Sequence, residues 1–164
     1  MSPQKIIYSC KSWKEFTDRL SELPTKKERG TVFEWFCKFY LQTNPKYKLY
    51  YKNVWHSSEF VKQTKHQKKL KIPDPEIGTD LVGQTVHGKY EIIQCKYKDD
   101  VTKNIYLSDI KSSITVASRE VTRNYVDTIL MCSNCQALTA KIKKLKHELQ
   151  ITSLLGGEIG RAHV

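Results

Sequence analysis

Two strand-like runs separated by a short turn place the tightest limit on how this chain can fold. Asp80–Val86 and Lys89–Lys98 are rich in apolar and β-branched residues, and His87-Gly88 lies where they join. Apolar runs on either side of a glycine-containing turn predict a β-hairpin. The register of that hairpin then decides which polar side chains share a face.

The length of the turn sets this register. If Val86-His87-Gly88 forms a three-residue loop with its glycine in the left-handed conformation, Asp80 lies opposite Gln94. Gln94 and Lys96 are two positions apart on one strand, so both side chains point to the same face as Asp80. A two-residue loop would pair Asp80 with Cys95, because a one-residue slip reverses the faces. We predict the three-residue loop.

The rest of the chain predicts a mixed sheet covered by helices, the arrangement of an α/β domain. Helical spacing of apolar residues and strand-like apolar runs alternate along the sequence. The expected helices are Ser12–Leu23, Thr31–Gln42 after a charged break at Pro24–Gly30, Ser108–Arg119 and Ala137–Leu149. The other expected strands are Tyr47–Trp55, Val126–Met131 and Ile151–Leu155, while Ser57–Lys71 fits a short helix or an exposed loop.

The length of 164 residues suits one globular domain with a single core. We expect this domain to span residues 1–157, with a helical extension over 1–29 and the core over 30–155. The last residues, 158–164, read EIGRAHV and resemble a translated sequencing adapter. We therefore expect them to be a non-native tail and the natural protein to continue beyond it.

The charge of the chain is strongly positive. Lys and Arg number 28 against 17 Asp and Glu, giving a net charge of +11 and a pI near 9.4. This balance favours a polyanionic partner, with nucleic acid first and an anionic membrane second, although an excess of solvated surface lysines has the same composition.

The compartment is expected to be the reducing cytoplasm. No signal peptide or membrane-spanning apolar run is visible in the sequence. The five cysteines are an odd number scattered along the chain, unlike a secreted disulfide framework. Cys132 and Cys135 have the CxxC spacing of a redox or metal pair, but no second pair stands at zinc-site spacing. We favour two small residues at a strand exit.

Asp80, Gln94 and Lys96 carry the chemistry that phosphodiester hydrolysis needs. A carboxylate such as Asp80 can hold Mg²⁺, and the Gln94 amide oxygen is a weaker ligand of the same hard type. The Lys96 ammonium can polarise an attacking water and offset phosphate charge. Glu34 is the candidate for a further carboxylate, since it is an acid in an otherwise apolar helix.

Each of these residues also has a structural interpretation. Asp80 follows Gly78 and can be a turn residue at a strand start, a common place for Asp. Lys96 can be a solvent-facing strand lysine beside Lys98, and Glu34 a helix acid paired with a basic group.

The stretch GTDLV followed by QCK resembles the PD-(D/E)xK nuclease signature in its Mrr-like version, in which Gln replaces the usual acid. The upstream helix GTVFEWFCKFYL is similar to the first core helix of that family, so the resemblance covers Thr31–Leu155. It implies a restriction-endonuclease-like fold and DNA cleavage with Mg²⁺ or Mn²⁺. It also implies Asp80 as metal ligand, Gln94 at the second ligand position, Lys96 as catalytic lysine and Glu34 as auxiliary ligand.

The resemblance is to nuclease domains at the N-terminus of large restriction proteins and helicases. It implies work either as a homodimer or with fused or associated helicase or methyltransferase domains. Gln94 in place of an acid lowers the charge at the metal, which keeps open an inactive nucleic-acid-binding module of the same fold. A junction-resolvase-like nuclease is a further alternative.

The basic segments Lys62–Lys71 and Lys141–Lys146 are the expected phosphate-contacting surface. Tyr50, Tyr51 and Trp55 could stack bases, although packing in a half-buried strand is the commoner role of such side chains.

Overall fold

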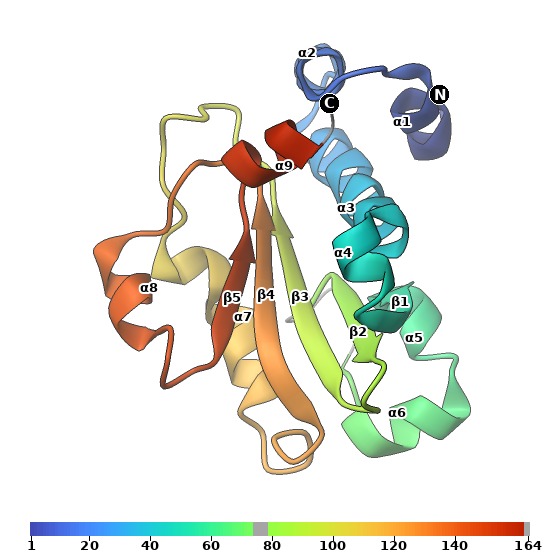
Figure 1. Ribbon diagram of the computed structural model, residues 1–164, viewed down its shortest axis with the longest axis vertical. Helices are drawn as coiled ribbons and strands as arrows, with labels where there is room; N and C mark the ends of the chain where they lie inside the picture. Colours follow the sequence, from blue (N-terminus) through green and yellow to red (C-terminus); the bar gives the residue numbers. More distant parts are fainter. Residues whose placement is uncertain (74–78, 163–164) are drawn as a thin grey trace.

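A five-stranded mixed sheet forms the centre of the molecule, and the computed structural model describes residues 1–73 and 79–162 of the chain (Figure 1). The strands lie in chain order across the sheet: β1 (Tyr51–His56), β2 (Leu81–Thr85), β3 (Tyr90–Lys96), β4 (Val126–Ser133) and β5 (Ile151–Leu154). The first three strands are antiparallel, and β3, β4 and β5 are parallel. The predicted α/β fold with a mixed sheet is confirmed.

Helices cover both faces of this sheet. Along the chain they are α1 (Pro3–Ser9), α2 (Trp13–Ser21), α3 (Lys26–Thr43), α4 (Pro45–Lys48), α5 (Ser57–Phe60), α6 (Thr64–Leu70), α7 (Leu107–Ala117), α8 (Ala140–Leu145) and α9 (Gly156–Ala162). α3 packs on β1 and β3 from one side, and α7 packs on β3 and β4 from the other (Figure 1). β3 is therefore covered on both faces by these two helices.

The hairpin of β2 and β3 has the register that the sequence predicts. Leu81 pairs with Ile93 and Gly83 with Glu91, so the residue before β2, Asp80, lies opposite Gln94. The turn holds three residues between Thr85 and Lys89, whose backbones are joined by a 2.8 Å hydrogen bond. Its glycine, Gly88, has φ +83°, the left-handed conformation that the prediction requires.

The helix α3 begins earlier than predicted. It starts at Lys26, so most of the charged segment 24–30 is helical rather than a break. The Thr25 hydroxyl accepts a hydrogen bond from the Glu28 backbone N–H at 3.1 Å, which caps the helix. The extra turn matters for function because it brings basic side chains beside the end of β3.

Other boundaries were also predicted incorrectly. Residues 45–48 form α4, so β1 begins at Tyr51 instead of Tyr47. The basic helix predicted to end at Leu149 ends at Leu145, and Gln150 takes a positive φ of 51° before β5. The segment 57–71 was predicted to be a short helix or an exposed loop. It contains two short helices, α5 and α6, so the helical alternative is confirmed.

The C-terminal residues pack against the α3 side of the sheet. Ile159 of α9 is fully buried there, and Glu158 lies 3.5 Å from Lys46. The non-native origin of residues 158–164 stays a prediction, and so does the division between the helical extension 1–29 and the core 30–155. Residues 163–164 lie outside the described part of the chain. Within residues 1–73 and 79–162, no helix has the length and apolar character to cross a membrane.

Gly88 and Gly30 provide a matched test of the hairpin turn. Gly88→Ala places a side chain at a positive φ, so we expect the free energy of unfolding to fall by about 1–2 kcal/mol. Gly30→Ala adds a methyl group to α3 that would contact no other part of the fold within 4 Å, and it should stabilise the protein by about 0.5–1 kcal/mol. Urea unfolding of both variants checks this; a neutral Gly88→Ala would contradict the left-handed turn.

Candidate active site

A cleft of about 730 Å³ opens where β2 begins and β3 ends. The start of α3 forms one wall, and the loop after β3 forms another. The four residues predicted from the sequence all line it: Glu34, Asp80, Gln94 and Lys96. Further lining comes from Lys26, Lys27, Arg29, Gly30, Thr31, Cys95, Tyr97, Lys98, Asp99, Asp100, Lys103 and Tyr106.

Asp80 is fixed by two hydrogen bonds to one of its carboxylate oxygens. The backbone N–H of Cys95 donates to Oδ2 at 2.8 Å, and the Gln94 side-chain amide donates to the same atom at 2.6 Å. Burial raises the pKa of Asp80, while the Cys95 N–H and the nearby charge of Lys96 oppose that shift. The pairing of β2 with β3 thus aims this carboxylate at the cleft.

The Gln94 amide bridges Asp80 and α7. Its nitrogen donates to Asp80, and its oxygen accepts a 2.7 Å hydrogen bond from the hydroxyl of Ser113, which is fully buried. Sequence reasoning missed Ser113. A usable signal was present, because Ser113 lies three positions after Ile110 on the apolar face of the helix, where a polar side chain needs a partner.

Glu34 reaches Asp80 from the opposite layer of the molecule. It lies on α3, and its pKa is raised to about 8 by burial first, then by the negative charge of Asp80 and a hydrogen bond with it. Two carboxyl groups from different elements therefore meet in one cleft. Burial, and then the repulsion between two adjacent negative charges, therefore disfavour the ionised form of Glu34.

Lys96 and Lys98, two and four positions after Gln94, differ in how firmly their ammonium groups are held. Lys98 Nζ lies 2.8 Å from an Asp109 carboxylate oxygen and 4.4 Å from the centre of the Tyr106 ring, and its side chain is 14% exposed. Lys96 Nζ is 4.0 Å from Asp109, and its side chain is 45% exposed. Asp109 also accepts from the Tyr106 backbone N–H at the start of α7. Lys98 is held in place, whereas the Lys96 ammonium is available to the cleft.

Basic side chains surround this acidic centre, and sequence reasoning did not identify them. Lys26, Lys27 and Arg29 come from the first turn of α3, and Lys103 from the loop after β3. Arg29 Nε lies 3.0 Å from Asp99, joining the two walls. The lysines of 62–71 and 141–146, expected to contact phosphate, are not among the residues that line this cleft.

Cys132 and Cys135 do not act as a pair. Both are buried free thiols, but Cys132 belongs to the apolar cluster on the α3 side and Cys135 to the cluster behind the sheet. The pKa of Cys132 is lowered to about 5 by hydrogen bonds with the thiols of Cys37 and then Cys95, against the effect of burial. The acidic thiol thus has partners from other elements, and the CxxC spacing is incidental.

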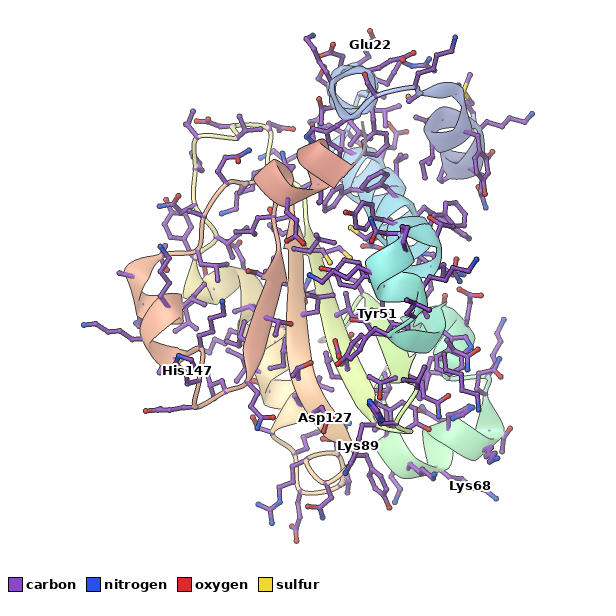
Figure 2. All side chains as sticks on the ribbon, viewed as in Figure 1. Glu22, Tyr51, Lys68, Lys89, Asp127 and His147 are labelled. Carbon is purple, nitrogen blue, oxygen red and sulfur yellow. The ribbon has the colours of Figure 1, made fainter. Side chains whose placement is uncertain are left out.

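Tyr50, Tyr51 and Trp55, in β1 or directly before it, pack against other side chains or form internal hydrogen bonds. The hydroxyls of Tyr50 and Tyr51 both donate to the buried carboxylate of Glu91. Figure 2 shows Tyr51 lying over the strands, and Trp55 packs edge-on against Phe60. Base stacking by these side chains has no support in this arrangement.

Comparisons with known proteins identify the family and the fold of this chain. A protein family described as "Restriction endonuclease" matches residues 42–163, a span that includes Asp80, Gln94 and Lys96. Among solved structures, "ATP-dependent Type ISP restriction-modification enzyme LlaBIII bound to DNA" superposes with a TM-score of 0.63 and 23% identity. The match covers 88% of this chain and 8% of that one, which is far longer. The comparison with curated proteins found no match.

The raised pKa of Glu34 predicts a pH-dependent stability. Between its ordinary value of 4.5 and about 8, the folded protein holds a proton that the unfolded chain has released. This contribution is complete below the unfolded pKa and is lost as the pH rises through the folded value. In chelator, the free energy of unfolding should therefore fall with pH in the wild type more steeply than in Glu34→Gln.

The measurement is urea unfolding at pH values from about 5 to about 9. Glu120→Gln, which changes an exposed acid on the α7 side, is the control and should follow the wild type. Parallel curves for the wild type and Glu34→Gln would show that Glu34 ionises normally in the fold.

Proposed function

Because the chain belongs to the Mrr-like restriction endonuclease family, we propose that this cleft hydrolyses DNA phosphodiester bonds with the help of Mg²⁺, or Mn²⁺ in its place. The observation that carries the proposal is the meeting of Asp80 and Glu34 beside the exposed Lys96. These groups come from α3, the start of β2 and the end of β3, so only the fold assembles them.

The donor set fits a hard divalent cation. Asp80 and Glu34 offer carboxylate oxygens, the ligands that Mg²⁺ prefers, and their mutual repulsion favours a positive charge between them. A cation bound there would stabilise the negative charge that develops on the phosphate and lower the pKa of a bound water. Binding requires Glu34 to release its proton, so affinity should rise with pH.

Lys96 is the group we assign to the nucleophile and the phosphate. Its ammonium lies on the same strand face as Gln94 and is more exposed than Lys98. From this position it can orient an attacking water and offset charge on the transition state. Asp109 pairs closely with Lys98 and lies at the outer limit of an ion pair with Lys96, which leaves the Lys96 ammonium available to the cleft.

Gln94 is proposed to contribute its amide in place of the usual acid. With the nitrogen toward Asp80, it orients that carboxylate, and Ser113 holds the amide in this direction. For its oxygen to join the ligands of a cation, the amide must turn over and lose both hydrogen bonds. Gln94 is therefore a weaker ligand than an acid, and the carboxylates of Asp80 and Glu34 carry most of the binding.

The basic rim suits the DNA backbone. Lys26, Lys27 and Lys103 surround the carboxylates and would contact phosphates on either side of the scissile bond, which gives affinity without reading sequence. The structural neighbour is a DNA-bound, ATP-dependent restriction-modification enzyme, of which the match covers 8%. We propose that this chain supplies the nuclease domain of a larger protein that also has helicase or methyltransferase parts.

Lys96→Ala should slow DNA cleavage strongly. With Mg²⁺ or Mn²⁺, the wild type is expected to nick supercoiled plasmid, EDTA to stop the reaction, and Lys96→Ala to be slower by at least about 100-fold. The control is Lys68→Ala, an exposed lysine on α6 near the hairpin turn, at the end of the sheet away from the end of β3 (Figure 2). It should cleave at the wild-type rate.

Plasmid cleavage that Lys96→Ala retains would remove this lysine from the chemistry. If no protein cleaves and calorimetry detects no metal binding, the inactive DNA-binding module becomes the better description. A strong preference for branched over linear DNA would favour the junction-resolvase-like alternative.

The position of the basic rim predicts which lysines bind DNA. The double substitution Lys26→Ala/Lys27→Ala should weaken binding to duplex DNA and reduce the slope of log K against log salt by about 2, since each lost phosphate contact removes about 0.9. Lys143→Ala/Lys144→Ala removes the same charge from exposed positions on α8 and should change the slope little. Fluorescence anisotropy at several salt concentrations measures both; the reverse order would place DNA on α8.

A further inference from the structure

Three buried cysteines from three elements meet behind the candidate active site. Cys37 lies on α3, Cys95 on β3 and Cys132 on β4, where Cys95 and Cys132 are direct neighbours across the parallel strand pair. Their sulfur atoms all lie within 4.8 Å of one another, and the three side chains are buried. All are free thiols, and together they form the only such group of possible ligands among the described residues.

The spacing of the sulfur atoms is close to that of a metal site. Thiolates at about 2.3 Å from a shared zinc ion lie about 4 Å apart, so shifts of less than about 1 Å bring these three onto one ion. Two of the three are already fixed next to each other by strand pairing, and Cys37 approaches them from the packed helix. The entropy cost of bringing the three cysteines together is therefore largely met by folding, before an ion binds.

The chemistry of the site selects a soft divalent ion. Sulfur ligands favour Zn²⁺ and its soft relatives over Mg²⁺, which prefers oxygen. Three thiolates around a divalent ion leave one negative charge in the apolar core, whereas a monovalent ion leaves two. Burying charge is costly, so the divalent ion is favoured.

The cluster is connected to the cleft from two directions. Cys95 lies between Gln94 and Lys96 and is one of the residues that line the cleft, although its side chain belongs to the core cluster beneath α3. Its backbone N–H holds Asp80, and Cys37 lies one helical turn after Glu34. Drawing the sulfur atoms together therefore moves the backbone that positions both carboxylates.

We propose that Cys37, Cys95 and Cys132 form a binding site for a divalent thiophilic ion of the Zn²⁺ class, distinct from the catalytic cation site, and that its occupancy inhibits the nuclease. Each cysteine that still holds its proton releases it to solvent on binding, and three thiolates around one divalent ion give a complex of charge −1. The inhibition rests on the proposed nuclease function, whereas ion binding does not.

The test uses Cd²⁺ as the probe, added to the full chain in a buffer with excess Mg²⁺ and a phosphine reductant. We expect one Cd²⁺ per chain, an ultraviolet sulfur-to-cadmium charge-transfer band, and a rise in thermal stability. Cys37→Ala and Cys132→Ala should each lose the band, with circular dichroism confirming that they are folded. Cys135→Ala, matched for burial, and Asp80→Asn, which lacks the catalytic carboxylate, should keep it.

Absence of the band in the wild type, or its persistence in both Cys37→Ala and Cys132→Ala, would overturn the site. Plasmid cleavage provides the second readout. Stoichiometric Cd²⁺ should reduce wild-type cleavage and spare Cys132→Ala. If the band forms as expected but wild-type cleavage is unchanged, the inhibitory role is wrong, and this outcome is distinct from a chain that never cleaves DNA.

Discussion

The hydrogen bond from the Cys95 backbone N–H to the Asp80 carboxylate is the contact on which the rest of the site depends. It exists because the hairpin turn holds three residues with Gly88 at positive φ, which sets β2 against β3 in one register. A slip of one residue would turn Gln94 away from Asp80 and bury the wrong side chains. The geometry of the candidate active site and the packing of the sheet thus depend on the same strand pairing.

The site keeps two acids together in a place that disfavours charge. Glu34 is carried on the layer above the sheet and Asp80 at its edge, and burial raises the pKa of both groups. Such an arrangement destabilises the ionised forms of both carboxyl groups. A cation bound between them would relieve their repulsion, as the proposed function requires. The ring of basic side chains outside the acids then complements a polyanion without neutralising the centre.

Successive side chains of β3 point to opposite faces of the sheet, so this strand contributes residues to both proposed ion sites. Gln94 and Lys96 face the cleft and α7, whereas Cys95 points into the core beneath α3, beside Cys132. Hard oxygen ligands and soft sulfur ligands are therefore separated by a single strand, and each set has a partner on α3. The proposed catalytic cation and the proposed thiophilic ion would therefore bind to different ligand chemistry, although β3 carries residues of both sites.

The sequence by itself determined the hairpin, its register and the mixed sheet, because local periodicity and turn chemistry are written in neighbouring residues. It also indicated Asp80, Gln94 and Lys96, which share one hairpin, and Glu34 as an acid in an apolar helix. It missed the first turn of α3, the support of Gln94 by Ser113 and the basic rim of the cleft. It also gave no sign that Cys132 meets Cys37 and Cys95 rather than Cys135. Those contacts join residues far apart in the chain, and only the packing of helices on the sheet decides which of them meet.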